Sequence, residues 1–145
     1  MTAKEYLSQV IKLKKKAESL TRKEEELRSR AEGLKAIVYD KDKVQVSAID
    51  QMPDAIAELI ETQVKLATTI AACYQYIARC EEMIGQLHSV KQAEVLRWRY
   101  IEDNNGRQYY FSEIAEIMHY TDTKQVIKLH KRALKAFSKK WEMGV

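Results

Sequence analysis

The chain has 145 residues, of which 46% are hydrophobic and 32% charged, and its net charge is +4. Four glycines and a single proline favour long helices over sheets, and the length suits one or two small domains. No apolar run approaches the roughly 18 residues that cross a bilayer, and the first residues lack the apolar stretch of a secretory leader. With its two cysteines, we expect a cytoplasmic protein without membrane contact.

Residues 3–36 repeat every seven residues, which predicts a long helix with one apolar seam. One row of the repeat contains Tyr6, Leu13, Leu20, Leu27 and Leu34, and the other contains Ala3, Val10, Ala17, Glu24 and Ala31. Opposite charges lie between the rows and can pair along the helix surface.

A second repeat with the same period predicts another long helix. Its rows are Met52, Leu59, Leu66, Cys73, Cys80 and Leu87, and Ile56, Gln63, Ile70, Ile77 and Ile84. Residues 37–50, which include Val44 and Val46, suit an extended connector, with Asp50 as N-cap and Pro53 in the first turn of the helix. The helices can then fold back antiparallel, or either seam can pair with another copy of the chain. We expect residues 1–87 to form a coiled-coil-like hairpin for oligomerisation or partner contact.

Two seam positions carry polar residues, and two carry cysteines. Glu24 and Gln63 either fix the register and choice of partner, as polar seam residues can, or mark an exposed, poorly packed layer. Cys73 and Cys80 lie two turns apart without a histidine at a zinc-ligand spacing. We therefore expect two buried thiols and no metal site.

The sequence contains no recognisable group of catalytic residues. His88, His119 and His130 are scattered, there is no glycine-rich phosphate loop, and the carboxylates are spread over helix surfaces. We expect neither an enzyme nor a bound cofactor, and we expect His130 at the edge of the core.

Residues 88–145 change to shorter elements and predict a small helical bundle after the hairpin, in an all-α chain. A short apolar helix over 91–102, with Val95, Leu96, Trp98, Tyr100 and Ile101, precedes a turn at 103–108. Ser112 is the expected cap of a helix of barely two turns that includes Ile114, Ala115 and Met118. A break at 119–122 follows, with Asp122 and Gln125 as a capping-box variant for a longer helix.

This order of a short helix, a tight turn and a longer helix predicts a helix-turn-helix motif, in which Ala115 allows a close crossing. The longer helix has one apolar face, Val126, Leu129, Ala133 and Phe137, flanked by His130, Leu134 and Trp141. Residues 123–141 hold seven positive charges and no negative charge, and Lys124, Lys128, Lys131, Lys135 and Lys139 form a ridge beside Arg132. DNA phosphates would neutralise such a ridge; the alternative is a face that only solubilises the protein.

Residues 95–137 resemble region 4 of bacterial sigma factors. The matching features are "VLRWRY", a loop, "FSEIAEIM", a capped turn and "LHKRAL". With the helical N-terminal half, the chain is similar to sigma-like phage transcriptional regulators of the ArpU/RinA type. The resemblance covers about a third of the chain.

The resemblance implies transcriptional control by a phage or prophage protein whose helix from Thr123 lies in the major groove of duplex DNA. By position, the candidate base contacts are Thr123, Lys124, Gln125, Ile127 and Lys128, and further candidate DNA contacts are Lys131, Arg132, Lys135 and Lys139. The cap of this helix falls at Asp122 when counted back from Ala133, and at Thr121 when counted forward from Ile114. RNA polymerase is a further candidate partner, through the hairpin.

Two other functions fit parts of the sequence. A coiled-coil adaptor could bind an acidic protein through its basic C-terminal region and never contact DNA. A small DNA-packaging subunit of the terminase type also combines a helical hairpin with a helix-turn-helix. The pattern of residues 95–137 favours the regulator.

Overall fold

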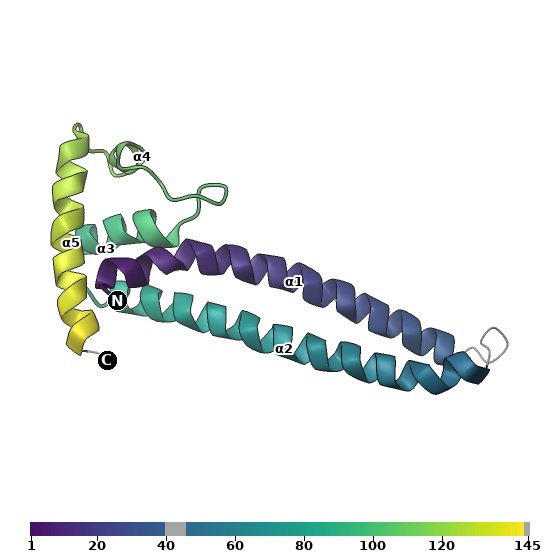
Figure 1. Ribbon diagram of the computed structural model, residues 1–145. Coiled ribbons are helices and arrows are strands. Elements are labelled where there is room, and N and C mark those ends of the chain that lie inside the picture. Colours follow the sequence, from purple (N-terminus) through teal and green to yellow (C-terminus); the bar gives the residue numbers. More distant parts are fainter. Residues whose placement is uncertain (40–45, 144–145) are drawn as a thin grey trace. The chain divides into compact units, whose positions relative to one another are not determined.

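The computed structural model describes the backbone of residues 1–39 and 46–143 and the side chains of residues 1–34 and 54–143. These residues form five α-helices and one π-helical turn, with no β-strand among them (Figure 1). The elements are α1 (Ala3–Tyr39), α2 (Val46–Gly85), α3 (Val90–Leu96), the π-helical turn η1 (Arg97–Ile101), α4 (Phe111–Ile117) and α5 (Thr123–Met143). The prediction of an all-α chain is confirmed.

The chain divides into two compact units. One is Lys16–Cys73, and the other combines Met1–Lys15 with Tyr74–Val145. These boundaries differ from the predicted one at residue 87, because the start of α1 and the last turns of α2 pack with the C-terminal elements. We refer to the two units as the hairpin unit and the C-terminal unit.

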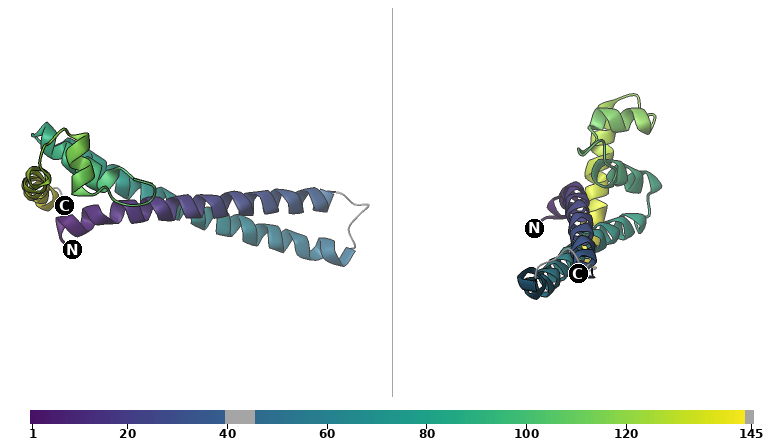
Figure 2. Two further views of the ribbon diagram at one scale, coloured as in Figure 1. Left: turned by 90° about the horizontal axis from the view of Figure 1, so that it is seen from above. Right: turned by 90° about the vertical axis from the view of Figure 1, so that its right-hand side faces the viewer.

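In the hairpin unit, a segment of α1 and a segment of α2 lie side by side and antiparallel (Figures 1 and 2). Nε2 of Gln63 donates a hydrogen bond to Oε1 of Glu24 over 2.9 Å. Further along, Leu34 of α1 lines a pocket with Ala55 and Leu59 of α2, so later residues of α1 face earlier residues of α2. The predicted antiparallel hairpin is therefore present within this unit.

The helix ends near the predicted connector differ from expectation. Because α1 continues to Tyr39 and α2 begins at Val46, the connector predicted for residues 37–50 is wrong at both ends, and Asp50 is not the N-cap. Extending an existing helix adds one hydrogen bond per residue without a new nucleation cost, which outweighs the weak strand preference of Val46. Val44 and the side chains of Met52 and Pro53 lie outside the described residues.

The C-terminal unit is built around one apolar core to which α1, α2, α3, η1, α4 and α5 all contribute. Leu7, Ile84, Leu96, Tyr100 and Phe137 are among its largest fully buried side chains. Within this unit, α5 lies across α3 rather than alongside it (Figure 2). Burial on this scale is the main favourable contribution to the stability of such a unit.

Aromatic side chains hold the start of α1 in this unit. The ring centroid of Tyr6 lies 4.5 Å from that of Tyr76 and 5.7 Å from that of Trp141. The hydroxyl group of Tyr76 also donates to the carbonyl oxygen of Tyr6 over 2.8 Å, and Nζ of Lys14 donates to the carbonyl oxygen of Ile101. The first 15 residues are therefore part of the scaffold that supports α5.

The apolar helix predicted for residues 91–102 is present as α3 followed by η1. Its buried residues form two pairs five positions apart, Val95 with Leu96 and Tyr100 with Ile101. An α-helix would rotate the second pair by about 140° from the first. In η1 the N–H of Glu102 donates to the carbonyl of Arg97 over 2.8 Å, and the wider π turn reduces that rotation so that both pairs reach the core.

Candidate nucleic-acid interface

A tight hairpin turn leads towards α4. Asn104 and Arg107 exchange two backbone hydrogen bonds of 2.9 and 3.2 Å, and the residues between them, Asn105 and Gly106, have φ angles of 53° and 89°. Positive φ at both central positions identifies a type I′ turn, for which Asn-Gly is a preferred sequence. The turn predicted from composition at residues 103–108 is confirmed.

Glu113 connects this turn to the start of α4. Its carboxylate accepts hydrogen bonds from both Nη atoms of Arg107 (2.8 and 3.1 Å), from Nδ2 of Asn104 (3.1 Å) and from the backbone N–H of Tyr110 (2.8 Å). The hydrogen bonds from Arg107, followed by that from Tyr110, lower the pKa of Glu113 to about 2. The carboxylate is therefore charged over the whole physiological range.

The start of α4 corrects one sequence prediction. The helix begins at Phe111, with Tyr110 as its N-cap residue, so the prediction that Ser112 caps it is wrong. Glu113, at the third helical position, accepts the N–H of Tyr110, as the acidic member of a capping box does. The ion pair with Arg107 holds the carboxylate of Glu113 in place, and the helix therefore begins before Ser112. The side chain of Ser112 is exposed.

The turn after α4 is a Schellman motif. His119 has a positive φ of 61°, its N–H donates to the carbonyl of Glu116 over 3.2 Å, and the N–H of Tyr120 donates to the carbonyl of Ala115 over 2.8 Å. Oδ1 of Asp122 then accepts the N–H of Lys124 over 3.0 Å. The cap of α5 is therefore Asp122 rather than Thr121.

The two helices joined by this turn pack against each other. Ile114 and Ala115 of α4 are buried, as is Val126 of α5. Ala115 is only 5% exposed, which agrees with the predicted need for a small side chain at this crossing. The arrangement is a short helix, a turn and a longer helix with a shared core.

The predicted apolar face of α5 packs against the rest of the unit. Val126, Ala133 and Phe137 are fully buried, while Leu129 is partly buried. His130 is 6% exposed, so it lies within the core and not at its edge as expected. Its Nε2 is 2.7 Å from the hydroxyl oxygen of Tyr100, and burial lowers its pKa to about 4.

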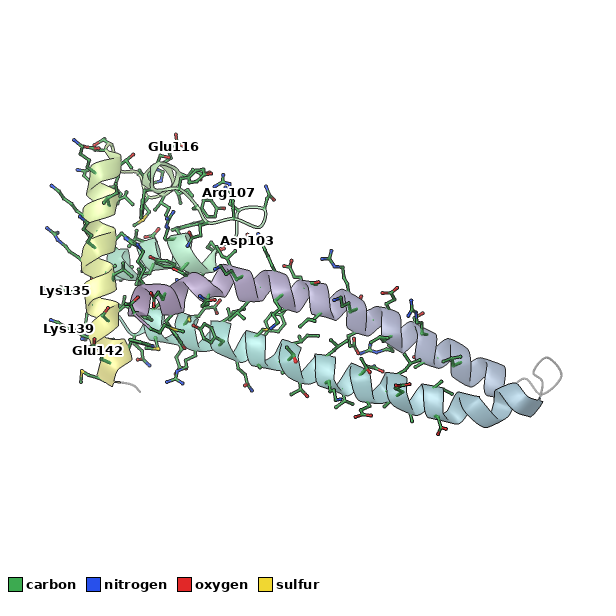
Figure 3. The ribbon with its side chains drawn as sticks, viewed as in Figure 1. Asp103, Arg107, Glu116, Lys135, Lys139 and Glu142 are labelled. Carbon is green, nitrogen blue, oxygen red and sulfur yellow. The ribbon has the colours of Figure 1, made fainter. Side chains whose placement is uncertain are left out.

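All the predicted DNA contacts lie on α5, and most are exposed. Lys124, Gln125, Lys128, Lys131, Arg132, Lys135 and Lys139 are exposed, and Thr123 and Ile127 are partly exposed. Within the part of the chain that the structure describes, none of these cations forms an ion pair with a carboxylate. The side chains of Lys135 and Lys139 point outward from α5 (Figure 3). An anionic partner could therefore reach them without breaking an existing ion pair.

A groove beside this face adds residues that the sequence prediction missed. It has a volume of about 580 Å³ and is lined by Leu87, His88, Ser89, Gln92, Arg132, Lys135, Ala136, Lys139 and Lys140. Ser89 caps α3 by accepting the N–H of Gln92 over 3.2 Å. A serine before a helix can be recognised in a sequence, but its position next to α5 depends on long-range packing.

The two cysteines are buried free thiols, as predicted. Burial raises the pKa of Cys80 to about 11. No group of three or more histidine, cysteine, aspartate or glutamate side chains among the described residues could hold a metal ion. In the same part of the chain, no helix combines the length and the apolar character needed to cross a membrane.

Comparisons with protein-family models, with curated proteins and with solved structures found no match. The resemblance to sigma-factor region 4 therefore stays a prediction that rests on residues 95–137.

Proposed function

We propose that this protein is a sequence-specific, double-stranded DNA-binding transcriptional regulator that uses α5 as its recognition helix. The observation that carries the proposal is the charge of α5. Residues 123–141 contain seven cations and no carboxylate, and the face opposite the lysine ridge is buried. Packing the apolar face presents the lysines to solvent in a fixed arrangement. A duplex would neutralise them and release its condensed counterions.

The structure around the start of α5 supports a division of roles along the helix. Asp122 fixes the first turn through the N–H of Lys124, so both Lys124 and Gln125 are held at an accessible helix end. In helix-turn-helix proteins, residues near this end contact base edges, whereas contacts to phosphates position the protein. We assign base contacts to Thr123, Lys124, Gln125, Ile127 and Lys128. Phosphate contacts are assigned to Lys131, Arg132, Lys135 and Lys139.

A self-association role for the hairpin unit completes the proposal. Ala57, Ile60, Val64, Ala67 and Ala71 are all exposed on α2 and follow each other at alternating intervals of three and four residues. Ile60 and Val64 are 39% and 59% exposed. This spacing is that of a coiled-coil seam, and it is separate from the seam that pairs α2 with α1. A second copy of the chain would bury it, and RNA polymerase is the alternative partner of this surface.

The same exposed stripe favours one competing function, a coiled-coil adaptor that binds proteins and not DNA. The full proposal places the protein in the cytoplasm of a bacterial host, encoded by a phage or prophage. Both functions predict self-association, so only nucleic-acid binding separates them.

Fluorescence anisotropy with labelled duplexes at several salt concentrations tests the proposed function. We expect measurable affinity that falls steeply with salt, and a Lys128→Glu/Lys131→Glu variant should lose it. The matched control is Lys16→Glu/Lys23→Glu, which makes the same charge change on exposed residues of the hairpin unit. Absence of duplex affinity at low salt would favour the adaptor.

Sequencing of genomic fragments retained by the protein distinguishes regulation from DNA packaging. A defined motif upstream of genes supports the regulator, whereas enrichment at a packaging site supports a terminase-type subunit.

Sedimentation velocity tests self-association. We expect Val64→Glu to shift the full chain towards the monomer, because it places a charge within the apolar stripe. Ala72→Glu adds the same charge at another exposed position of α2 and should leave the distribution unchanged. Monomeric parent protein at tens of micromolar would contradict the self-association role alone.

A further inference from the structure

The groove beside the C-terminal half of α5 combines cations from α5 with polar groups from the segment that enters α3. Arg132, Lys135, Lys139 and Lys140 lie on one side, and His88, Ser89 and Gln92 lie on the other; among the residues that the structure describes, no carboxylate lines it. A neighbouring concavity that also borders α3 contains both Glu94 and Glu102 with Arg97. Of these two concavities beside α3, only the groove therefore has an excess of positive charge.

The arrangement of these cations suits an anion with several oxygen atoms. Arg132, Lys135 and Lys139 are three and four residues apart on α5, so they are neighbours on the helix surface and repel each other. Leu87 and Ala136 add apolar surface to the groove, which reduces hydration and strengthens contacts between opposite charges. None of the four cations is paired with a carboxylate of the described residues.

Hydrogen-bond donors are also available on the α3 side. Oγ of Ser89 accepts the N–H of Gln92, and its own hydroxyl hydrogen remains free to donate to a ligand. The side-chain amide of Gln92 provides two further donors, and the guanidinium group of Arg132 can bind two phosphate oxygens at once. A phosphate group could therefore receive charge from α5 and hydrogen bonds from both sides.

The length of α5 identifies which phosphate could reach the groove. The helix has 21 residues and is about 32 Å long, and Ala136 lies about 18 Å along the axis from Lys124. The major groove of B-DNA is only about 12 Å wide. If the first turn of α5 contacts bases, the C-terminal half of the helix extends past the edge of the major groove towards the sugar–phosphate backbone.

We propose that this groove binds a backbone phosphate of duplex DNA, beyond the bases contacted by the first turns of α5. The inference rests on the proposed function and extends the interface to His88, Ser89, Gln92 and Lys140. The segment that enters α3 and the C-terminal half of α5 then form the two sides of one phosphate-binding site. Because a phosphate carries no sequence information, the groove contributes affinity and orientation rather than base discrimination.

Adding a negative charge to the groove tests whether a phosphate binds there, without removing a lysine. Gln92→Glu should weaken binding roughly tenfold, because a carboxylate would face the phosphate, and preferred and scrambled duplexes should be weakened equally. Gln75→Glu makes the same charge change at an exposed position of α2 outside the groove and should bind like the parent. Thermal melts of both variants establish that they remain folded.

The salt dependence of binding provides an independent measurement. Lys139→Gln/Lys140→Gln should lower the slope of log K against log salt by about two. Lys16→Gln/Lys23→Gln, in the hairpin unit, should leave it unchanged.

These measurements separate the groove from DNA binding itself. If the parent binds duplexes but Gln92→Glu matches Gln75→Glu and the salt slope is unchanged, the groove proposal is overturned together with the phosphate contact assigned to Lys139, and DNA binding by the rest of α5 stands. If the parent binds no duplex at low salt, the groove proposal and the proposed function are both overturned.

Discussion

The hydroxyl oxygen of Tyr100 lies 2.7 Å from Nε2 of His130, so one hydrogen bond joins η1 to the middle of α5 inside the core. The two residues are 2% and 6% exposed. Burial raises the pKa of Tyr100 to about 12 and lowers that of His130 to about 4. Near neutral pH the bond therefore joins two uncharged groups at a position that supports the basic face of α5.

We expect the C-terminal unit to lose stability as the pH falls from 6.5 towards 4. The ordinary pKa of histidine is 6.5 and that of folded His130 is about 4, so the unfolded chain binds more protons in this interval. The contribution is fully present above pH 6.5, and its loss amounts to at most about 3 kcal/mol. Chemical unfolding followed by the fluorescence of Trp98 and Trp141, both in this unit, measures it at each pH.

A double variant provides the control for this prediction. Tyr100→Phe/His130→Leu removes both hydrogen-bonding groups together, so neither leaves an unpaired partner in the core, and its stability should no longer fall between pH 6.5 and 4.5. His88→Gln changes an exposed histidine and should behave like the parent. An unchanged loss in the double variant would show that another group is responsible.

Glu113 should control stability in a more acidic range. Its pKa is lowered from 4.5 to about 2, so its stabilising effect is present above pH 4.5 and is lost as the pH falls towards 2. At pH 7, Glu113→Gln should lower the melting temperature, because the ion pair with Arg107 and its hydrogen bonds to the 104–107 turn are weakened. Glu116→Gln, at an exposed position of the same helix, is the matched control. Equal melting temperatures for the two variants would refute this role.

The hydrogen bond between Glu24 and Gln63 should fix the register of the hairpin unit. Glu24 is 8% exposed, and it accepts hydrogen bonds from Gln63 (2.9 Å) and Arg28 (2.6 Å). The bond from Gln63 is the main cause of its lowered pKa. Gln63→Leu should therefore lower the melting temperature, because it leaves a nearly buried carboxylate without one of its donors.

Replacing both polar residues should have a different effect from replacing one. Glu24→Leu/Gln63→Leu should recover the melting temperature, since an apolar pair can pack as well as a buried polar one. It should also allow more than one helix pairing, because the polar residues specify the register. Backbone amide NMR spectra would then show extra sets of signals for the hairpin unit. A single set of signals would contradict the register role.

Local patterns were enough to predict several features of the fold. The period of the seams located α1 and α2, and the alternation of apolar and basic residues located α5, because both depend only on residues a few positions apart. The Asn-Gly turn and the cap at Asp122 were also visible, since their geometry is set by neighbouring residues.

Long-range packing decided what the sequence could not reveal. Leu7 is fully buried although it lies outside both predicted rows of α1, because the start of this helix joins the core of the C-terminal unit. Glu113, not Ser112, sets the start of α4 through Arg107. In the same way, the sequence located all the predicted DNA contacts on α5. The groove beside them could not be predicted, because it depends on the packing of α3 against that helix.

Base contacts and phosphate contacts on α5 should respond differently to mutation. Lys124 and Gln125 occupy the first turn, whereas Lys135 lies about 16 Å further along the axis. Lys124→Ala leaves the cap intact, because Asp122 accepts the backbone N–H of residue 124 and not its side chain. Lys124→Ala or Gln125→Ala should therefore reduce discrimination between the preferred site and a scrambled duplex, by roughly 1–3 kcal/mol if a good bidentate contact is lost.

Lys135→Ala should weaken binding about equally on both duplexes and lower the salt slope by about one, since a phosphate contact releases a counterion from any sequence. Lys23→Ala, at an exposed position of the hairpin unit, is the control for loss of one positive charge. Titration of each variant against both duplexes at several salt concentrations gives discrimination and slope from the same data. If Lys124→Ala and Gln125→Ala keep full discrimination, the start of α5 does not read the bases. If Lys135→Ala alone abolishes discrimination, the two roles are assigned to the wrong ends of the helix.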